Sequence, residues 1–176
     1  MTVTVSAAGL WEAEQIADVA AVTFPLACPP GSSRESIESF IDDVLSHSRF
    51  GDYLSDPTRT ILAAREDDSI VGYAMLIHGD PVDPAISSVL AHSPTMELSK
   101  MYVMPGHHGS GVSAELMRAA SACAVDAGCA GMWLGVNQYN SRAQRFYAKH
   151  GFAVVGTKTF TVGAETHDDF VMERAL

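Results

Sequence analysis

The sequence predicts an α/β fold in which one sheet with mixed strand directions forms a single domain over residues 1–176. Segments in which apolar residues alternate are interleaved with segments of helical period, which indicates a sheet covered by helices. Two pairs of predicted strands follow each other across a short turn, so the strands cannot all be parallel. The chain is 47% hydrophobic and 18% charged, which supplies enough apolar surface for one core.

The N-terminal third begins with an alternating strand at residues 2–6 and continues into two predicted helices. Residues 9–24 place apolar side chains at helical spacing until the stretch PLACPPGSS interrupts the pattern. Ser33, which precedes several acidic residues, is a candidate N-cap for a second helix over residues 34–48.

The middle of the chain predicts two strands at residues 59–67 and 69–79 that are joined by a short turn. A Pro-rich loop at 80–94 leads to a strand at 95–104, and a glycine-containing turn then opens a helix at 111–127.

The C-terminal part predicts a strand at 131–136 and a helix at 140–150 that ends at Gly151. Two strands at 152–163 and 167–175 close the chain. The order is therefore β-α-α-β-β-β-α-β-α-β-β.

Charge restricts the possible partners. The formal net charge is −10 and the pI is near 4.9, which argues against a general nucleic-acid-binding protein because such proteins need a basic surface. Residues 1–60 hold nine acidic and three basic residues. This acidic region can attract a cationic substrate, or it can serve solubility alone.

Targeting signals are not apparent in the sequence. No apolar run is long enough to span a bilayer, and the N-terminus lacks a positive segment followed by an apolar one. We therefore expect a cytoplasmic protein with no membrane partner and no signal peptide. The odd number of cysteines, Cys28, Cys123 and Cys129, fits reduced apolar residues better than a disulfide or a metal site.

The turn after the strand at 95–104 has the features of a phosphate-binding site. Gly109 and Gly111 allow a ligand to approach the backbone, and Ser110, Val112 and Ser113 supply further N–H groups at a helix N-terminus. The turn has neither the Gly-Lys-Ser/Thr of a Walker A loop nor a dinucleotide fingerprint. A strand-to-helix turn without a ligand is an equally good interpretation of the glycines alone.

A longer pattern in the second half of the chain resembles the GNAT family of acetyl-CoA-dependent N-acetyltransferases. The segment NSRAQRFYAKHGF follows the family pattern N-x-x-A-x-x-F-Y-x-K-x-G-F. Its matching residues are Asn140, Ala143, Phe146, Tyr147, Lys149, Gly151 and Phe152. The resemblance implies acetyl transfer to an amine and a central mixed, twisted sheet of about seven strands with helices on both faces.

The preceding segment, LSKMYVMPGHHGSGVSAEL, resembles the coenzyme A motif of the family. The resemblance implies that acetyl-CoA is the cosubstrate, that its pyrophosphate lies in the glycine turn, and that no metal takes part. Two residues depart from the usual motif: His108 replaces Arg or Gln, and Ser113 replaces Gly or Ala. His107 and His108 can also be solvated loop residues with no ligand.

The resemblance also assigns roles near the reacting atoms. Met101, Tyr102 and Val103 correspond to the backbone that faces the pantetheine arm, and Asn140 to a residue that binds the coenzyme nearby. Tyr147 corresponds to the general acid that protonates the leaving thiolate, a task that suits a Tyr hydroxyl. Without the motif, Tyr147 would be interpreted as an aromatic residue that packs in a helix.

Glu97 is the candidate general base, acting through water, because MELSKMYV resembles the base-bearing strand of the family. An ordinary strand residue is the alternative. Gly135 stands where ribosomal-protein alanine acetyltransferases carry a Glu, so the base of that subgroup is missing here.

The C-terminal segment TFTVGAETHDDFVM, with Phe160, Gly163, Asp169 and Met172, is most similar to spermidine/spermine N-acetyltransferases of the PaiA type. This resemblance implies a polyamine or another small cationic amine as acceptor. Acidic residues of the second predicted helix are candidates to hold its ammonium groups: Glu35, Glu38, Asp42 and Asp43. The alternatives are a module that binds acetyl-CoA without catalysis, and a peptide or protein N-acetyltransferase. The family also makes a homodimer possible.

Overall fold

A computed structural model, which describes residues 2–107 and 111–176, contains a seven-stranded sheet in the order β1-β2-β3-β4-β5-β7-β6. Only β4 and β5 pair in parallel. This mixed sheet with helices confirms the predicted fold class. The strands are β1 (Val3–Ala7), β2 (Arg59–Glu66), β3 (Ser69–His78), β4 (Thr95–Val103), β5 (Gly131–Asn137), β6 (Ala153–Val162) and β7 (Glu165–Ala175).

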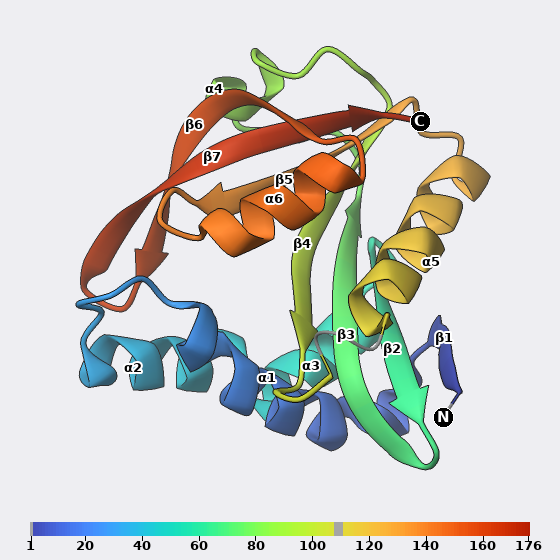
Figure 1. The fold of residues 1–176 in the computed structure, drawn as a ribbon, viewed down its shortest axis with the longest axis vertical. Coiled ribbons are helices and arrows are strands. Elements are labelled where there is room, and N and C mark those ends of the chain that lie inside the picture. Colours follow the sequence, from blue (N-terminus) through green and yellow to red (C-terminus); the bar gives the residue numbers. More distant parts are fainter. Residues whose placement is uncertain (1, 108–110) are drawn as a thin grey trace.

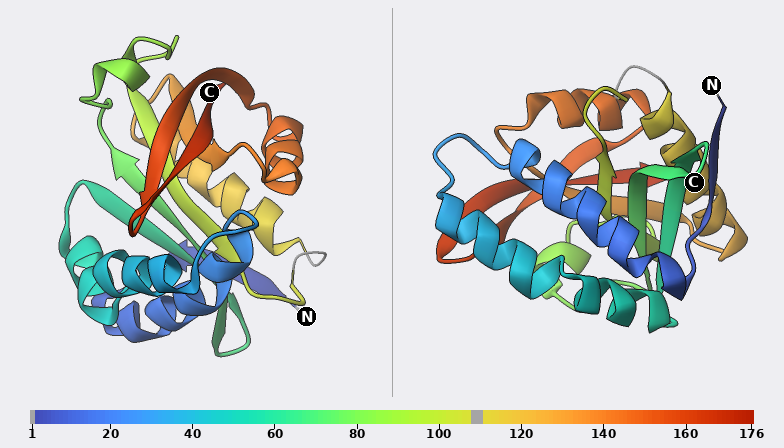
Figure 2. Two further views of the ribbon diagram at one scale, coloured as in Figure 1. Left: turned by 90° about the vertical axis from the view of Figure 1, so that its left-hand side faces the viewer. Right: turned by 90° about the horizontal axis from the view of Figure 1, so that it is seen from below.

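The helices cover both faces of the sheet (Figures 1 and 2). One face packs against α5 and α6, and the other against α1, α2 and α3, with a separate apolar core on each side. The helices are α1 (Ala13–Ala27), α2 (Arg34–Val44), α3 (His47–Ser55), α4 (Pro84–Ser87), α5 (Val112–Asp126) and α6 (Ser141–Lys149). Within the described ranges, no helix is long and apolar enough to cross a membrane.

The single helix predicted over residues 34–48 is wrong, because the chain forms two helices there. Ser33 caps α2 as predicted, since its Oγ accepts a hydrogen bond from the Ser36 N–H at 3.1 Å. The predicted single helix is interrupted at Ser46, which is the N-cap of α3. Its Oγ accepts a hydrogen bond from the Arg49 N–H at 3.2 Å. A serine inside an apolar pattern can thus cap a new helix.

Two other boundaries differ from the prediction. Helix α1 continues through Pro25 to Ala27. The proline lies in the last turn, where its missing N–H removes only one backbone bond near the helix end. The predicted loop at 80–94 contains the short helix α4, and the Asp83 carboxylate caps it by accepting from the Ala85 N–H at 2.9 Å.

Strands β4 and β5 separate soon after they begin, and this separation positions the site. They pair only from Thr95 to Glu97 on β4, although both strands continue further. Strand β4 also carries a bulge against β3, because Met75 pairs with Lys100 while Leu76 pairs with Leu98. Such a bulge bends the strand and changes the direction of the following side chains.

Candidate active site

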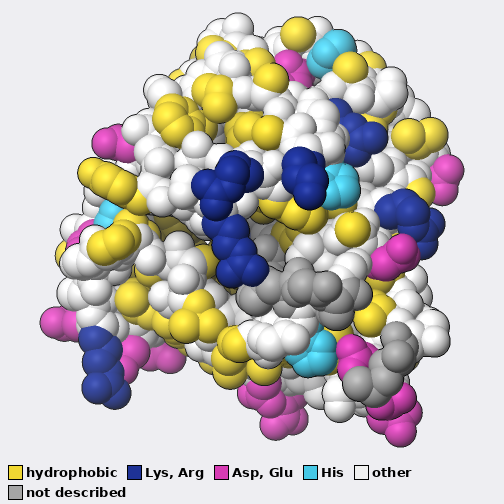
Figure 3. All heavy atoms as spheres, viewed as in Figure 1, with side chains coloured by type: hydrophobic (Ala, Val, Ile, Leu, Met, Phe, Trp, Pro, Cys, Tyr) yellow, Lys and Arg dark blue, Asp and Glu magenta, His cyan; other side chains and the backbone are white. Residues whose placement is uncertain are grey.

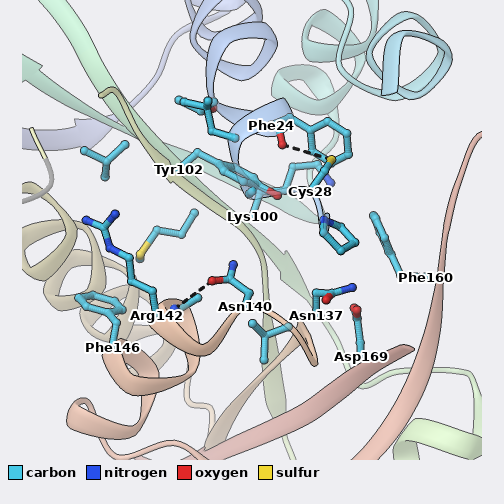
Figure 4. Close-up of a pocket in the computed structure, with 18 of the residues that line it drawn as sticks. Phe24, Cys28, Lys100, Tyr102, Asn137, Asn140, Arg142, Phe146, Phe160 and Asp169 are labelled. Carbon is cyan, nitrogen blue, oxygen red and sulfur yellow. Dashed lines mark hydrogen bonds between the residues drawn. The ribbon is translucent and has the colours of Figure 1, made fainter. Parts of the chain in front are cut away.

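A cavity of about 670 Å³ opens where β4 and β5 separate (Figure 4). Its walls come from the end of α1, the second half of β4, the start of α5, the N-terminal turns of α6 and the β6–β7 hairpin. Most of its side chains are apolar or aromatic, with a few polar groups among them, which is the composition of a small-molecule site.

The backbone of β4 provides polar groups along one wall. The Met104 N–H donates to the Val71 carbonyl of β3 at 2.8 Å. Because strand residues alternate, Met101 and Val103 direct their N–H and C=O groups away from β3, toward the space where β5 has separated. The backbone N–H and C=O of Tyr102 point toward β3 and not toward the cavity, which differs from the expectation that its backbone faces the pantetheine arm. Tyr102 lines the cavity with its side chain.

The glycine turn is described from Gly111 onward, while His108, Gly109 and Ser110 lie outside the described residues. Gly111 is the N-cap of α5 with a φ of 83°, a conformation that favours glycine. A Cβ on Gly111 would meet no atom within 4 Å, so open space lies in front of it.

Gly111 and Ser113 line the cavity, whereas the Val112 side chain is fully buried in the core. The N-terminus of a 15-residue helix with open space before it fits a phosphate. The described part of the turn therefore fits the pyrophosphate of coenzyme A.

Asn140 caps the N-terminus of α6 and lines the same cavity. Its Oδ1 accepts a hydrogen bond from the Ala143 N–H at 3.1 Å. Its Nδ2 has no hydrogen-bond acceptor among the described residues, so it is available to a ligand (Figure 4). The asparagine thus combines a structural role with a free donor.

Tyr147 lies on α6 and also lines the cavity. Its ring packs edge-on against Phe146 and Phe152, with centroids at 5.6 and 6.0 Å. Burial raises the pKa of Tyr147 to about 12. The hydroxyl makes no hydrogen bond within the described part of the chain, so it remains a protonated donor toward the cavity.

Glu97 lies on β4 at the last residue that pairs with β5, and it is not among the residues that line the cavity. Burial raises its pKa, while the positive charges of Lys100 and Lys158 act in the opposite direction. The structure therefore places Glu97 behind Lys100 on the same face of β4, since their partners Ile77 and Met75 are two residues apart on β3.

The acidic residues of the second predicted helix do not reach the cavity. Glu35, Glu38, Asp42 and Asp43 are exposed on α2, and none of them lines it. Glu38 forms an exposed ion pair with Arg34 at 2.8 Å. Any effect of these four carboxylates on a substrate would be long-range attraction.

Sequence reasoning gave no site role to three charged residues of the cavity: Lys100, Asp169 and Arg142. Asp169 is buried on β7, and its Oδ2 lies 3.6 Å from the Lys158 Nζ. This pair occupies the space beside Gly135, where a Cβ would come within 2.5 Å of the Lys158 side chain. No local pattern reveals the pair, because long-range strand pairing brings it together.

Positive charge near the glycine turn comes from α6. Arg142 lines the cavity, and Arg142 and Arg145 are exposed with no hydrogen bond or ion pair to any described residue. Figure 3 shows Lys and Arg side chains gathered over this helix beside a hollow in the surface. Helix α6 therefore brings the positive charge of Arg142 to the cavity that Gly111 lines.

Comparison with known proteins agrees with this geometry. The acetyltransferase (GNAT) family matches residues 20–152. Uncharacterised N-acetyltransferases of Mycobacterium tuberculosis and Mycobacterium bovis are 53% identical to the chain over 165 residues, which is 94% of this chain and 98% of each relative.

Solved structures share the fold at lower identity. The PaiA N-acetyltransferase of Thermoplasma acidophilum, solved in complex with coenzyme A, superposes with a TM-score of 0.79 at 21% identity and covers all of both chains. An acetyltransferase of Staphylococcus epidermidis reaches a TM-score of 0.76 at 16% identity, over 99% of both chains.

Proposed function

Because the chain belongs to the GNAT family of N-acetyltransferases, we propose that it transfers an acetyl group from acetyl-CoA to an amine of a small molecule while both are bound. The observation that supports this most is the cavity at the β4–β5 separation, which Gly111 and Tyr147 line together. Coenzyme binding groups and a proton donor thus share one space.

Acetyl-CoA supplies the activated acetyl group as a thioester. Gly111 and Ser113 would hold its pyrophosphate, with Arg142, which lines the same cavity, neutralising phosphate charge. The backbone of Met101 and Val103 and the Nδ2 of Asn140 would hold the pantetheine arm.

The reaction exchanges a C–S bond for an N–C bond, so the amine must lose a proton and the departing sulfur must gain one. Tyr147 would donate the proton to sulfur, since burial keeps its hydroxyl protonated. Glu97 would accept the proton of the amine through water, because it lies behind the cavity wall.

Gly111→Ala should weaken acetyl-CoA binding by at least about tenfold, because a side chain strains the positive φ and fills the space before the helix N-terminus. Isothermal calorimetry measures the affinity. Gly128→Ala is the matched control: Gly128 has a φ of 80°, equally open space, and lies beyond the other end of α5. If Gly111→Ala and Gly128→Ala bound acetyl-CoA with equal affinity, the turn at Gly111 would not be part of the coenzyme site.

Arg142→Gln with Arg145→Gln should raise the Kd for coenzyme A by about tenfold and flatten its dependence on salt, because two exposed positive charges of α6 are lost. Arg34→Gln, which removes an exposed charge on α2, is the control. A salt dependence identical to that of the wild type would exclude these arginines from phosphate binding.

The acidic N-terminal third and the resemblance to PaiA-type enzymes make polyamines one class of acceptor to test. The test of the proposed function is release of coenzyme A, followed with a thiol reagent, over a panel of spermidine, other small amines and a peptide with a free N-terminus. Binding of acetyl-CoA without acceptor-dependent release would favour the non-catalytic module. Release with the peptide alone would favour a peptide acceptor.

A further inference from the structure

We propose, on the basis of the function above, that the preferred acceptor carries a carboxylate as well as its amine, and that the Lys100 ammonium binds this carboxylate. The acceptors would then be amines of amino-acid type. The proposal rests on the cavity wall opposite α6, where β4, the end of α1 and the β6–β7 hairpin meet (Figure 4).

Lys100 faces the cavity because of the bulge in β4. Its pairing with Met75 places it on the same face of the sheet as Tyr73 and Tyr102, which is the face covered by α1 and α3. Without the extra residue in β4, the alternation of side chains along the strand would place Lys100 and Glu97 on opposite faces of the sheet. Lys100 thus lines the cavity, and Glu97 remains behind it.

The Lys100 ammonium has no carboxylate partner in the described part of the chain. Two neighbouring cations do have one: Arg59 lies 3.4 Å from Asp56, and Lys158 lies 3.6 Å from Asp169. No hydrogen bond or ion pair joins Lys100 to a described residue. Burial lowers the pKa of Lys100 to about 8, and the charge of Glu97 acts in the opposite direction.

Apolar side chains surround this part of the cavity, among them Phe24, Phe40, Phe160 and Val162. An ammonium in such surroundings has lost water without gaining a partner, and an anionic group of a ligand would offset that cost. His167, on the same wall, supplies a second unpartnered group, because its buried Nε2 has no hydrogen-bond partner among the described residues.

The charge of the cavity fits a zwitterion better than a polyamine. Asp169 is the only acidic residue that lines it, within the described ranges, and its carboxylate already faces Lys158. A polyamine would bring several ammonium groups toward Lys100 and one engaged carboxylate. A carboxylate on the acceptor cancels the charge of one ammonium group, so lysine or ornithine brings one net positive charge where cadaverine or putrescine brings two.

The test compares amines that differ only in a carboxylate: lysine with cadaverine, and ornithine with putrescine, with spermidine added. With the purified protein, we expect kcat/KM to be about ten- to a hundredfold higher for the amino acids, the range of a charge-assisted hydrogen bond. Above about pH 8 this preference should decline as Lys100 loses its proton.

Lys100→Met should bring the ratio of kcat/KM between the paired acceptors close to one, and Lys100→Arg should retain more of the preference because it keeps the charge. Lys149→Met is the control, since Lys149 is exposed on α6 and does not line the cavity, and the ratio should not change.

Two results would overturn the inference alone: a wild-type preference for the diamines or spermidine, or a ratio that Lys100→Met leaves unchanged. If no amine of either kind supports release while acetyl-CoA still binds, the proposed function itself is wrong.

Discussion

Tyr147→Phe should lower turnover by about ten- to a thousandfold while acetyl-CoA still binds, because a general acid contributes in this range. The hydroxyl faces the cavity without a partner among the described residues, so the substitution removes a donor and leaves the ring packing in place. Steady-state kinetics at saturating acceptor, together with calorimetry of acetyl-CoA, separate the two effects.

The raised pKa of Tyr147 adds a pH criterion. With a pKa of about 12, the hydroxyl keeps its proton throughout the neutral and mildly alkaline range, so wild-type turnover should not decline there through loss of this acid. If wild-type turnover fell tenfold per pH unit in the neutral or mildly alkaline range, Tyr147 would not be the general acid.

Tyr53→Phe is the control for stability, because it also removes one hydroxyl. The Tyr53 hydroxyl donates to the Val44 carbonyl at 2.7 Å, and its loss costs about 1 kcal/mol of unfolding free energy. Tyr53 lies on α3 away from the cavity, so turnover should remain within about twofold. If Tyr102→Phe rather than Tyr147→Phe abolished turnover, Tyr102, which also lines the cavity, would be the acid.

The order of helices and strands along the chain was predictable from the sequence because each element leaves a local pattern. The glycine turn, the N-cap at Ser33 and the motif from Asn140 to Phe152 all act over a few residues. The failure at Ser46 has the same origin: the apolar spacing continues across it, and only the capping hydrogen bond reveals two helices.

The acceptor side of the site could not be predicted in this way. Lys100 reaches the cavity through a bulge that depends on pairing with β3, and Asp169 reaches it through the β5–β7 ladder. At Gly135 the sequence shows only that the Glu of the ribosomal-protein acetyltransferases is absent. In the structure, the side chains of Lys158 and Asp169, which come from other strands, occupy the space beside Gly135. These contacts are long-range, so periodicity and motif spacing carry no record of them.

Glu97→Gln should lower turnover most at low pH, by about a hundredfold near pH 6.5. The difference in turnover between the variant and the wild type should become smaller toward about pH 9. Burial raises the pKa of Glu97, so wild-type turnover should rise as the pH passes this raised pKa and the carboxylate becomes ionised. In the variant only acceptor that arrives as free amine reacts, and that fraction grows about tenfold per pH unit below the pKa of the amine.

The same substitution also acts on Lys100, and the two consequences have opposite pH dependence. The Glu97 charge favours the ammonium form of Lys100, so its removal should lower the Lys100 pKa below about 8. Weaker binding of a carboxylate acceptor would then raise KM above neutral pH, whereas loss of the base lowers kcat below it. Parallel kcat profiles of Glu97→Gln and the wild type would exclude Glu97 as the base, and a change in KM alone would leave it as a residue that positions the Lys100 charge.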